Sequence, residues 1–258
     1  MWAGFKKTVI TGGVGIALLV LGLILLYCFP LIFSYIIQKN LPLAKGSMSY
    51  KLWKDIPLPL YQKIYFFNVT NPEEFLQQKS KPKLVEIGPY TYRSWWTKEN
   101  ITWNNNDTVT YREVKKYVFK PELSVGSEND VITTVNFPML AAASWLRNTS
   151  PLEEIAASIL MFLTREKIFI QRKVKQLAYE GYPDLLTVIA PLIHPDVPKT
   201  HGYFGWFYGK NDTDDGEFTV FTGKDSISKF NTIKNWNGTQ SLKYWTGECN
   251  KIAGTSEY

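Results

Sequence analysis

The chain has 258 residues, of which 45% are hydrophobic and 20% are charged, and its formal net charge is +6. This hydrophobic content excludes a disordered tail, and the length suits one sizeable domain or two small ones. The charge is mild, since Lys6 and Lys7 supply two of it. It therefore gives no argument for nucleic-acid binding, and it fits anionic lipid or acidic protein surfaces only loosely.

The N-terminal segment predicts a membrane span. Residues 8–38 are 31 consecutive positions without a charged side chain, and Val9–Phe29 is almost wholly apolar. A helix of about 20 such residues crosses the core of a bilayer. Pro30 follows directly and is expected to end or bend the helix.

Two interpretations of this segment compete. A cleaved signal peptide has an apolar core of roughly 7–15 residues followed by a small-residue cleavage site. Here the core is longer and residues 29–33 offer no such site, which favours an uncleaved signal anchor. Residues 1–7 would then be a cytoplasmic tail, residues 8–38 the transmembrane signal anchor and residues 39–258 an extracellular or lumenal ectodomain.

Glycosylation sequons agree with this placement. All the Asn-x-Ser/Thr acceptors follow the apolar run, at Asn68, Asn100, Asn106, Asn148, Asn211 and Asn237. An acceptor is modified only if it reaches the secretory lumen, and burial would leave some of them unused. Cys249 is the one cysteine of the expected ectodomain, so it is either a free thiol or has its partner outside this sequence.

The first part of the expected ectodomain predicts β-structure. Four strands are expected, at Tyr61–Val69, Leu84–Ile87, Tyr90–Trp96 and Val109–Phe119. Pro72 opens a short helix after the first strand, and Gly88-Pro89 is expected to separate the second from the third. The turn at Asn104–Asp107 predicts that the last two strands form an antiparallel hairpin.

The middle of the chain predicts helices. Four are expected, beginning with one from Asn136 or Pro138 to Leu146, then at 150–163, at 173–179 and from 183 onward. The second begins at Ser150, whose Ser-x-x-Glu pattern is that of a capping box. The chain then returns to β-structure at residues 203–208 and 217–221, which flank an expected turn at residues 210–216.

The sequence holds little that points to catalysis or metal binding. His194 and His201 have no neighbouring residue at metal-ligand spacing, so no zinc site is expected. Asp212–Gly216 is similar to a calcium loop, but its glycine comes one position early and no glutamate follows in register. A solvated hairpin turn is the better interpretation, and we expect no metal, no cofactor and no enzyme.

A basic cluster in the helical middle is the candidate ligand-binding site. It consists of Arg165, Lys167, Arg172, Lys173 and Lys175. Apolar residues 168–170 interrupt it, and such a mixture suits anionic lipid head groups or acidic proteins while aliphatic stems cover apolar surface. On these residues alone, a solvated helix face is the better interpretation.

Taken together, several ordered segments resemble the class B scavenger receptors, the family of the fatty-acid translocase and the lysosomal integral membrane protein. They are Phe66–Glu74, Val85–Arg93, Phe119–Ser127, Ala141–Ser144, Glu180–Tyr182, Phe221–Lys224, Tyr244–Trp245, Cys249–Asn250 and Gly254–Thr255. The resemblance runs from the membrane segment to the last residue and covers the N-terminal half of a family member. Its specificity lies in the order of the set.

The resemblance implies an α+β fold, in which an N-terminal transmembrane helix precedes part of an antiparallel β-barrel ectodomain with an apical helical bundle at about residues 136–190. It implies a tunnel that carries hydrophobic lipid toward the bilayer. It also implies that Cys249 pairs with a cysteine of the second half of the family. The leading ligand-contact residues become Arg165, Lys167, Phe169, Arg172 and Lys173.

The function expected from this resemblance is that of a receptor in the plasma membrane or the lysosomal membrane. It would bind lipids, sterols, lipoproteins or lipid-bearing particles and pass lipid to the membrane through the tunnel, and a protein ligand would bind the apical helices. The alternative is a trafficking receptor for a lysosomal hydrolase. Family members also have a second membrane helix, so we expect the chain to be a fragment, an isoform or an incomplete gene model.

Overall fold

The computed structural model describes residues 2–146, 154–155, 158–159, 161–162, 165–193, 201–242, 245–252 and 254–255. These residues divide into two compact units. The first unit comprises residues up to 55, residues 98–112 and residues from 216 onward, and the second comprises residues 56–97 and 113–215.

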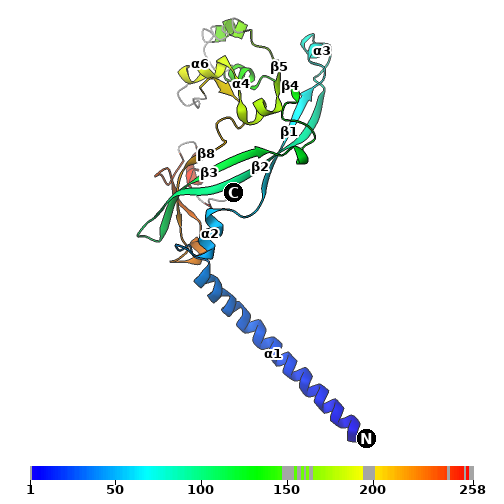
Figure 1. The fold of residues 1–258 in the computed structure, drawn as a ribbon, viewed down its shortest axis with the longest axis vertical. Helices are drawn as coiled ribbons and strands as arrows, with labels where there is room; N and C mark the ends of the chain where they lie inside the picture. The colour runs from blue at the N-terminus through cyan, green and yellow to red at the C-terminus, as the bar shows by residue number, and fades with distance from the viewer. Residues whose placement is uncertain are drawn as a thin grey trace. The chain divides into compact units, whose positions relative to one another are not determined.

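The elements follow one another along the chain as Figure 1 labels them. The helices are α1 (Trp2–Asn40), α2 (Met48–Lys54), α3 (Pro72–Leu76), α4 (Phe137–Leu146) and α6 (Leu185–Ile193). The strands are β1 (Leu60–Val69), β2 (Leu84–Trp103), β3 (Thr108–Phe119), β4 (Val131–Val135), β5 (Phe169–Lys173), β6 (Tyr182–Pro183), β7 (Tyr203–Phe204), β8 (Thr213–Phe221) and β9 (Ile233–Trp236). Single helical turns lie at Pro121–Leu123, Gln176–Glu180, Ile227–Lys229 and Gly247–Asn250. The expectation of a mixed α+β chain is therefore confirmed.

Helix α1 is long and apolar enough to cross a membrane over residues 12–40. Its described apolar side chains are exposed, as Leu26 and Phe29 illustrate, which suits contact with lipid and not with water. The expectation that Pro30 ends the helix is wrong, because the helix continues for ten residues beyond it. Proline is tolerated inside a membrane helix, where neighbouring groups satisfy the freed backbone.

The main sheet has the hydrogen-bonded order β1-β2-β3-β8-β9. Strand β1 is antiparallel to β2, and Leu60 lies opposite Ser94 in this register. The expected hairpin of β2 and β3 is confirmed, and the amide of Asn104 donates to the carbonyl oxygen of Thr108 across its turn at 2.9 Å. A closed barrel and an apical helical bundle stay predictions.

Gly88-Pro89 does not separate two strands, because β2 runs through it as one element of 20 residues. Instead the register shifts there. Ile64 lies opposite Tyr90 and Phe66 lies opposite Ile87, so β2 carries one extra residue, a β-bulge. The glycine is needed at this bulge, since a Cβ atom on it would meet the carbonyl oxygen of Ile64 at 2.9 Å.

Each unit has its own apolar core. The core of the first unit is built from Leu43, Trp53, Val109, Tyr111 and Val220. The core of the second unit is built from Phe66, Tyr90, Ile132, Val174, Leu177 and Tyr182. Full burial of such a side chain contributes about 1.5–3 kcal/mol, so each unit has a separate source of stability.

Two of the four expected helices begin where the sequence places them. Asn136 caps α4, since its Oδ1 accepts the amide of Met139 at 3.3 Å. Asp184 caps α6 in the same way through the amide of Thr187 at 3.3 Å. Helices α4 and α6 lie against each other in the second unit. The expected capping box at Ser150 lies outside the described residues.

The other helical and β predictions need correction. The helix expected from Lys173 begins later, because residues 169–173 form β5 and only residues 176–180 make a wide helical turn. Residues 210–216 are not a hairpin turn, since β8 starts at Thr213 and pairs with β9. Strand β7 is only two residues long and pairs with β6. In each case, pairing with a distant segment decides the structure.

Candidate functional site

The pairing of β4 with β5 divides the expected ligand residues between two faces. Ile132 lies opposite Arg172 in this antiparallel register. Side chains alternate between the faces of a strand, so Arg172 shares the core face with Ile132. Ile170 packs against the same core. Phe169 and Lys173 are on the opposite face of β5.

Arg172 is therefore a packing residue of the second unit. Its guanidinium lies over the ring of Tyr182, with 4.5 Å between the charged carbon and the ring centroid. Its Nη1 donates to the carbonyl oxygen of Gln171 at 3.0 Å. Its Nε is buried and has no hydrogen-bond partner among the described residues. The structure thus separates Arg172 from the other expected ligand contacts.

Three of the expected cationic contacts are exposed, namely Arg165, Lys167 and Lys173. Lys175, the remaining member of the basic cluster, forms an ion pair with Glu180 at 3.2 Å. The exposed cations flank Ile168–Ile170 in the sequence and leave charge available to an anionic ligand.

Phe169 connects this region to a pocket that the sequence analysis did not anticipate. Its ring meets the ring of Phe75 edge to face, with 5.4 Å between the centroids. The pocket has a volume of about 560 Å³ and is lined by residues 75–81, here called the α3 loop, together with Ile168. We call it the α3 pocket. Its size is in the range of ligand-binding clefts.

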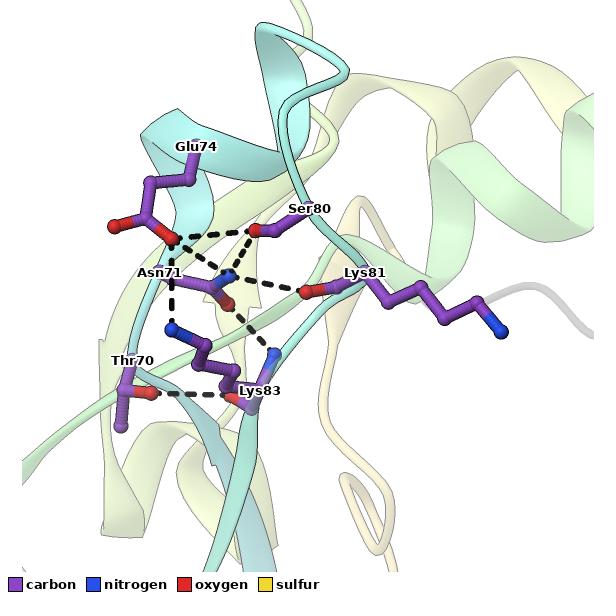
Figure 2. Close-up of polar contacts among 6 residues, drawn as sticks. All are labelled: Thr70, Asn71, Glu74, Ser80, Lys81 and Lys83. Carbon is purple, nitrogen blue, oxygen red and sulfur yellow. Dashed lines mark hydrogen bonds and ion pairs between the residues drawn. The ribbon is translucent and has the colours of Figure 1, made fainter.

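Asn71 holds the two ends of the α3 loop together, as Figure 2 shows. The Nδ2 of Asn71 donates to the Oγ of Ser80 at 2.7 Å and to the carbonyl oxygen of Lys81 at 3.0 Å. The Oδ1 of Asn71 accepts the amide of Lys83 at 2.6 Å. The Asn71 side chain is buried, so these bonds are shielded from competing water. The α3 loop is therefore fixed without a ligand.

Glu74 completes this network from helix α3. Its Oε2 lies 3.3 Å from the Asn71 Nδ2, 3.2 Å from the Ser80 Oγ and 3.7 Å from the Lys83 Nζ. The hydrogen bond from Asn71, followed by the charge of Lys83, lowers the pKa of the Glu74 carboxyl. The carboxylate thus stays ionised, and the charge of Lys83 is neutralised within the network.

Lys79 and Lys81 differ from Lys83. Both are exposed, and in the described part of the chain neither forms an ion pair. The side chain of Lys81 points away from the Asn71 network in Figure 2. The α3 pocket thus combines apolar walls from Phe75, Leu76 and Ile168 with two available ammonium groups. A sequence signal existed in the Lys-x-Lys-x-Lys pattern after Asn71-Pro72.

The structure also locates the expected glycosylation acceptors. Asn100, Asn106, Asn211 and Asn237 are exposed, whereas Asn68 is half-buried. The Oδ1 of Asn68 accepts the amide of Thr133 in β4 at 2.8 Å. Asn148 lies outside the described residues. Exposure alone does not report modification, so glycosylation stays a prediction at all six positions. Cys249 is an exposed free cysteine here, and its disulfide stays a prediction.

The acidic segment at residues 212–216 makes ion pairs in place of a turn. The Asp215 carboxylate lies 3.1 Å from the Nζ of Lys115 and 2.7 Å from the Nζ of Lys210. Lys210 is the main cause of a lowered pKa for Asp215. Within the described residues no group of His, Cys, Asp and Glu side chains is arranged to hold a metal ion. His201 is exposed, and His194 lies outside those residues.

Comparisons with known proteins agree with the family expected from the sequence. Residues 13–257 match the CD36 family. Scavenger receptor class B member 1 of Bos taurus is 37% identical over 252 residues, which cover 97% of this chain and 49% of the relative. Lysosome membrane protein 2 of Homo sapiens is 39% identical over 222 residues, which cover 85% of this chain and 45% of the relative.

The chain spans about half the length of these curated relatives. Its apolar helix α1 fits a membrane protein, as do the relatives, of which one is named as a lysosome membrane protein. The match extends over nearly the whole chain, through both compact units. The chain therefore belongs to the CD36 family, the class B scavenger receptors.

Proposed function

We propose that this protein is a membrane receptor that binds lipids, lipoproteins or lipid-bearing particles and passes hydrophobic lipid to the membrane. Membership of a scavenger receptor family supports a receptor role. The observation that carries the ligand assignment is the exposure of Arg165, Lys167 and Lys173 around the half-buried Phe169. Such a surface attracts anionic head groups and also offers apolar contact.

Transfer of lipid requires no chemical step. A long-chain lipid or sterol ester is nearly insoluble, so its movement needs an apolar path and an entry point that attracts its carrier. In this proposal the path is a tunnel through the complete ectodomain. The family resemblance supports it, and the receptor would not act as an enzyme.

The proposed topology follows from helix α1. Residues 1–7 are cytoplasmic, residues 8–38 anchor the chain and residues 39–258 are extracellular or lumenal. The sequons and Cys249 then lie in an oxidising compartment where glycosylation and disulfide formation occur. The membrane is either the plasma membrane or the lysosomal membrane, since relatives with both kinds of name are similar to the chain.

Binding of vesicles by cells that express the full chain tests this proposal. The vesicles are phosphatidylcholine with or without phosphatidylserine. Each cation near an anionic surface contributes about 1 kcal/mol, so the triple variant R165E/K167E/K173E should lose about 3 kcal/mol, roughly a hundredfold in affinity. The matched control K45E/K51E/K63E changes exposed lysines elsewhere by the same total charge and should retain binding.

Equal loss of binding in both triple variants would contradict the ligand assignment, because it would reflect net charge alone. Surface display of each variant is measured on the same cells with an antibody. Phosphatidylcholine vesicles without phosphatidylserine should show little difference between the variants.

The second candidate is a trafficking receptor that carries a lysosomal hydrolase. The similarity of 39% identity to lysosome membrane protein 2 favours it. In this case the triple variant R165E/K167E/K173E would lose a protein partner and retain lipid uptake. Loss of lipid uptake without loss of a co-purifying hydrolase would favour the first candidate.

A further inference from the structure

We infer that the α3 pocket is a docking site for a partner protein that presents an apolar anchor residue between acidic side chains. The pocket is separate from the exposed cations Arg165, Lys167 and Lys173. The inference does not depend on lipid transfer, so either function can fail without the other.

The walls of the α3 pocket suit an apolar anchor. Phe75, Leu76 and Ile168 supply its apolar surface, and its volume of about 560 Å³ accommodates a large side chain. Phe75 is held in place by the edge-to-face contact with Phe169. Pockets of this kind, filled by one anchor and surrounded by a polar rim, supply most of the free energy at protein interfaces.

The charge at the rim selects the partner. Lys79 and Lys81 line the pocket, and both are exposed. The nearest carboxylate of helix α3, Glu74, is already bound by Asn71, Ser80 and Lys83. Two ammonium groups beside an apolar hollow are complementary to carboxylates on either side of an apolar residue.

The α3 pocket is formed before any partner binds. The buried Asn71 side chain joins both ends of the loop through Ser80, Lys81 and Lys83, so little conformational entropy remains to be lost on association. A fixed loop also restricts where the two ammonium groups lie, which favours a defined arrangement of acidic residues in the partner.

The exposure of the pocket favours a protein over an isolated lipid. Leu76 is 53% exposed, and Gln78, Lys79 and Lys81 are also exposed. A free acyl chain in this hollow would keep much of its surface in water and gain only part of the transfer free energy. A protein surface covers the mouth of the pocket around its anchor and excludes that water.

Selection from a random peptide library tests the inference without knowledge of the natural partner. The full chain is presented in phosphatidylcholine nanodiscs. Enriched peptides should contain an aromatic or aliphatic residue flanked by Asp or Glu. Their affinity should fall roughly tenfold or more in K79E/K81E, since two ion pairs at the rim become repulsive, and should be retained in the matched control K45E/K63E.

Two further variants sharpen the result. Leu76→Ser should also weaken the enriched peptides, whereas K79E/K81E should itself select peptides with Lys or Arg in the flanking positions. Peptides without acidic residues, or peptides that bind K79E/K81E as tightly as the parent, would overturn the inference. So would binding of phosphatidylserine vesicles that needs Lys79 and Lys81 while no acidic peptide is enriched, because the site would then belong to a lipid.

Discussion

Replacement of Asn71 by alanine tests whether one buried side chain fixes the α3 loop. The change removes the bonds to Ser80 and Lys81 and the acceptor for the Lys83 amide. A hydrogen bond of this kind contributes about 1 kcal/mol net. Water can reach part of the freed backbone because the loop is largely exposed, so we expect a loss of about 2–3 kcal/mol in the free energy of unfolding.

Two measurements read this effect. Urea denaturation of the full chain reports the free energy of unfolding, and limited trypsin digestion reports opening of the loop through cleavage after Lys79. Cleavage should accelerate in Asn71→Ala even where the rest of the chain stays folded.

Glu74→Gln is the matched control, since it retains a side-chain oxygen in the network and removes only the exposed ion pair with Lys83. An exposed pair contributes little to stability, so this variant should behave as the parent does. If Asn71→Ala unfolds and is cleaved no faster than Glu74→Gln, the buried network does not fix the loop.

Three other predictions concern the second unit and the sequons. Burial raises the pKa of Asp184, so its contribution to stability falls as pH rises through that raised pKa. Asp184→Asn should abolish this slope and keep the α6 cap, whereas Asp184→Ala should lose about 1 kcal/mol, as measured by urea denaturation across acidic and neutral pH. Gly88→Ala should lose about 1–3 kcal/mol, because its Cβ atom meets the Ile64 carbonyl oxygen at 2.9 Å; a stability equal to the parent would refute this. Peptide mapping should find less glycan at the half-buried Asn68 than at the exposed Asn106, and full occupancy at both would contradict the role of exposure.

Local signals in the sequence predicted what local forces decide. Asn136 and Asp184 cap helices because their side-chain oxygens accept amide hydrogens from the next turn. The turn at Asn104–Asp107 joins two strands with strong β-propensity, so its hairpin was predictable as well. The family followed from an ordered set of segments.

Long-range pairing limited the rest. Strand β5 was mistaken for the approach to a helix because its partner β4 lies more than thirty residues earlier in the chain. That error placed Arg172 among solvent-facing contacts, although its partner Ile132 brings it to the core face. The α3 pocket was missed for the same reason, since Ile168 is far from the α3 loop in sequence.

Uptake of a fluorescent long-chain fatty acid by cells that express the full chain tests the proposed function most directly. We predict uptake above that of cells without the protein, with a clear reduction in R165E/K167E/K173E at equal surface display. Uptake no higher than in cells without the protein, with the chain shown to be at the surface and folded, would contradict a role in lipid transfer.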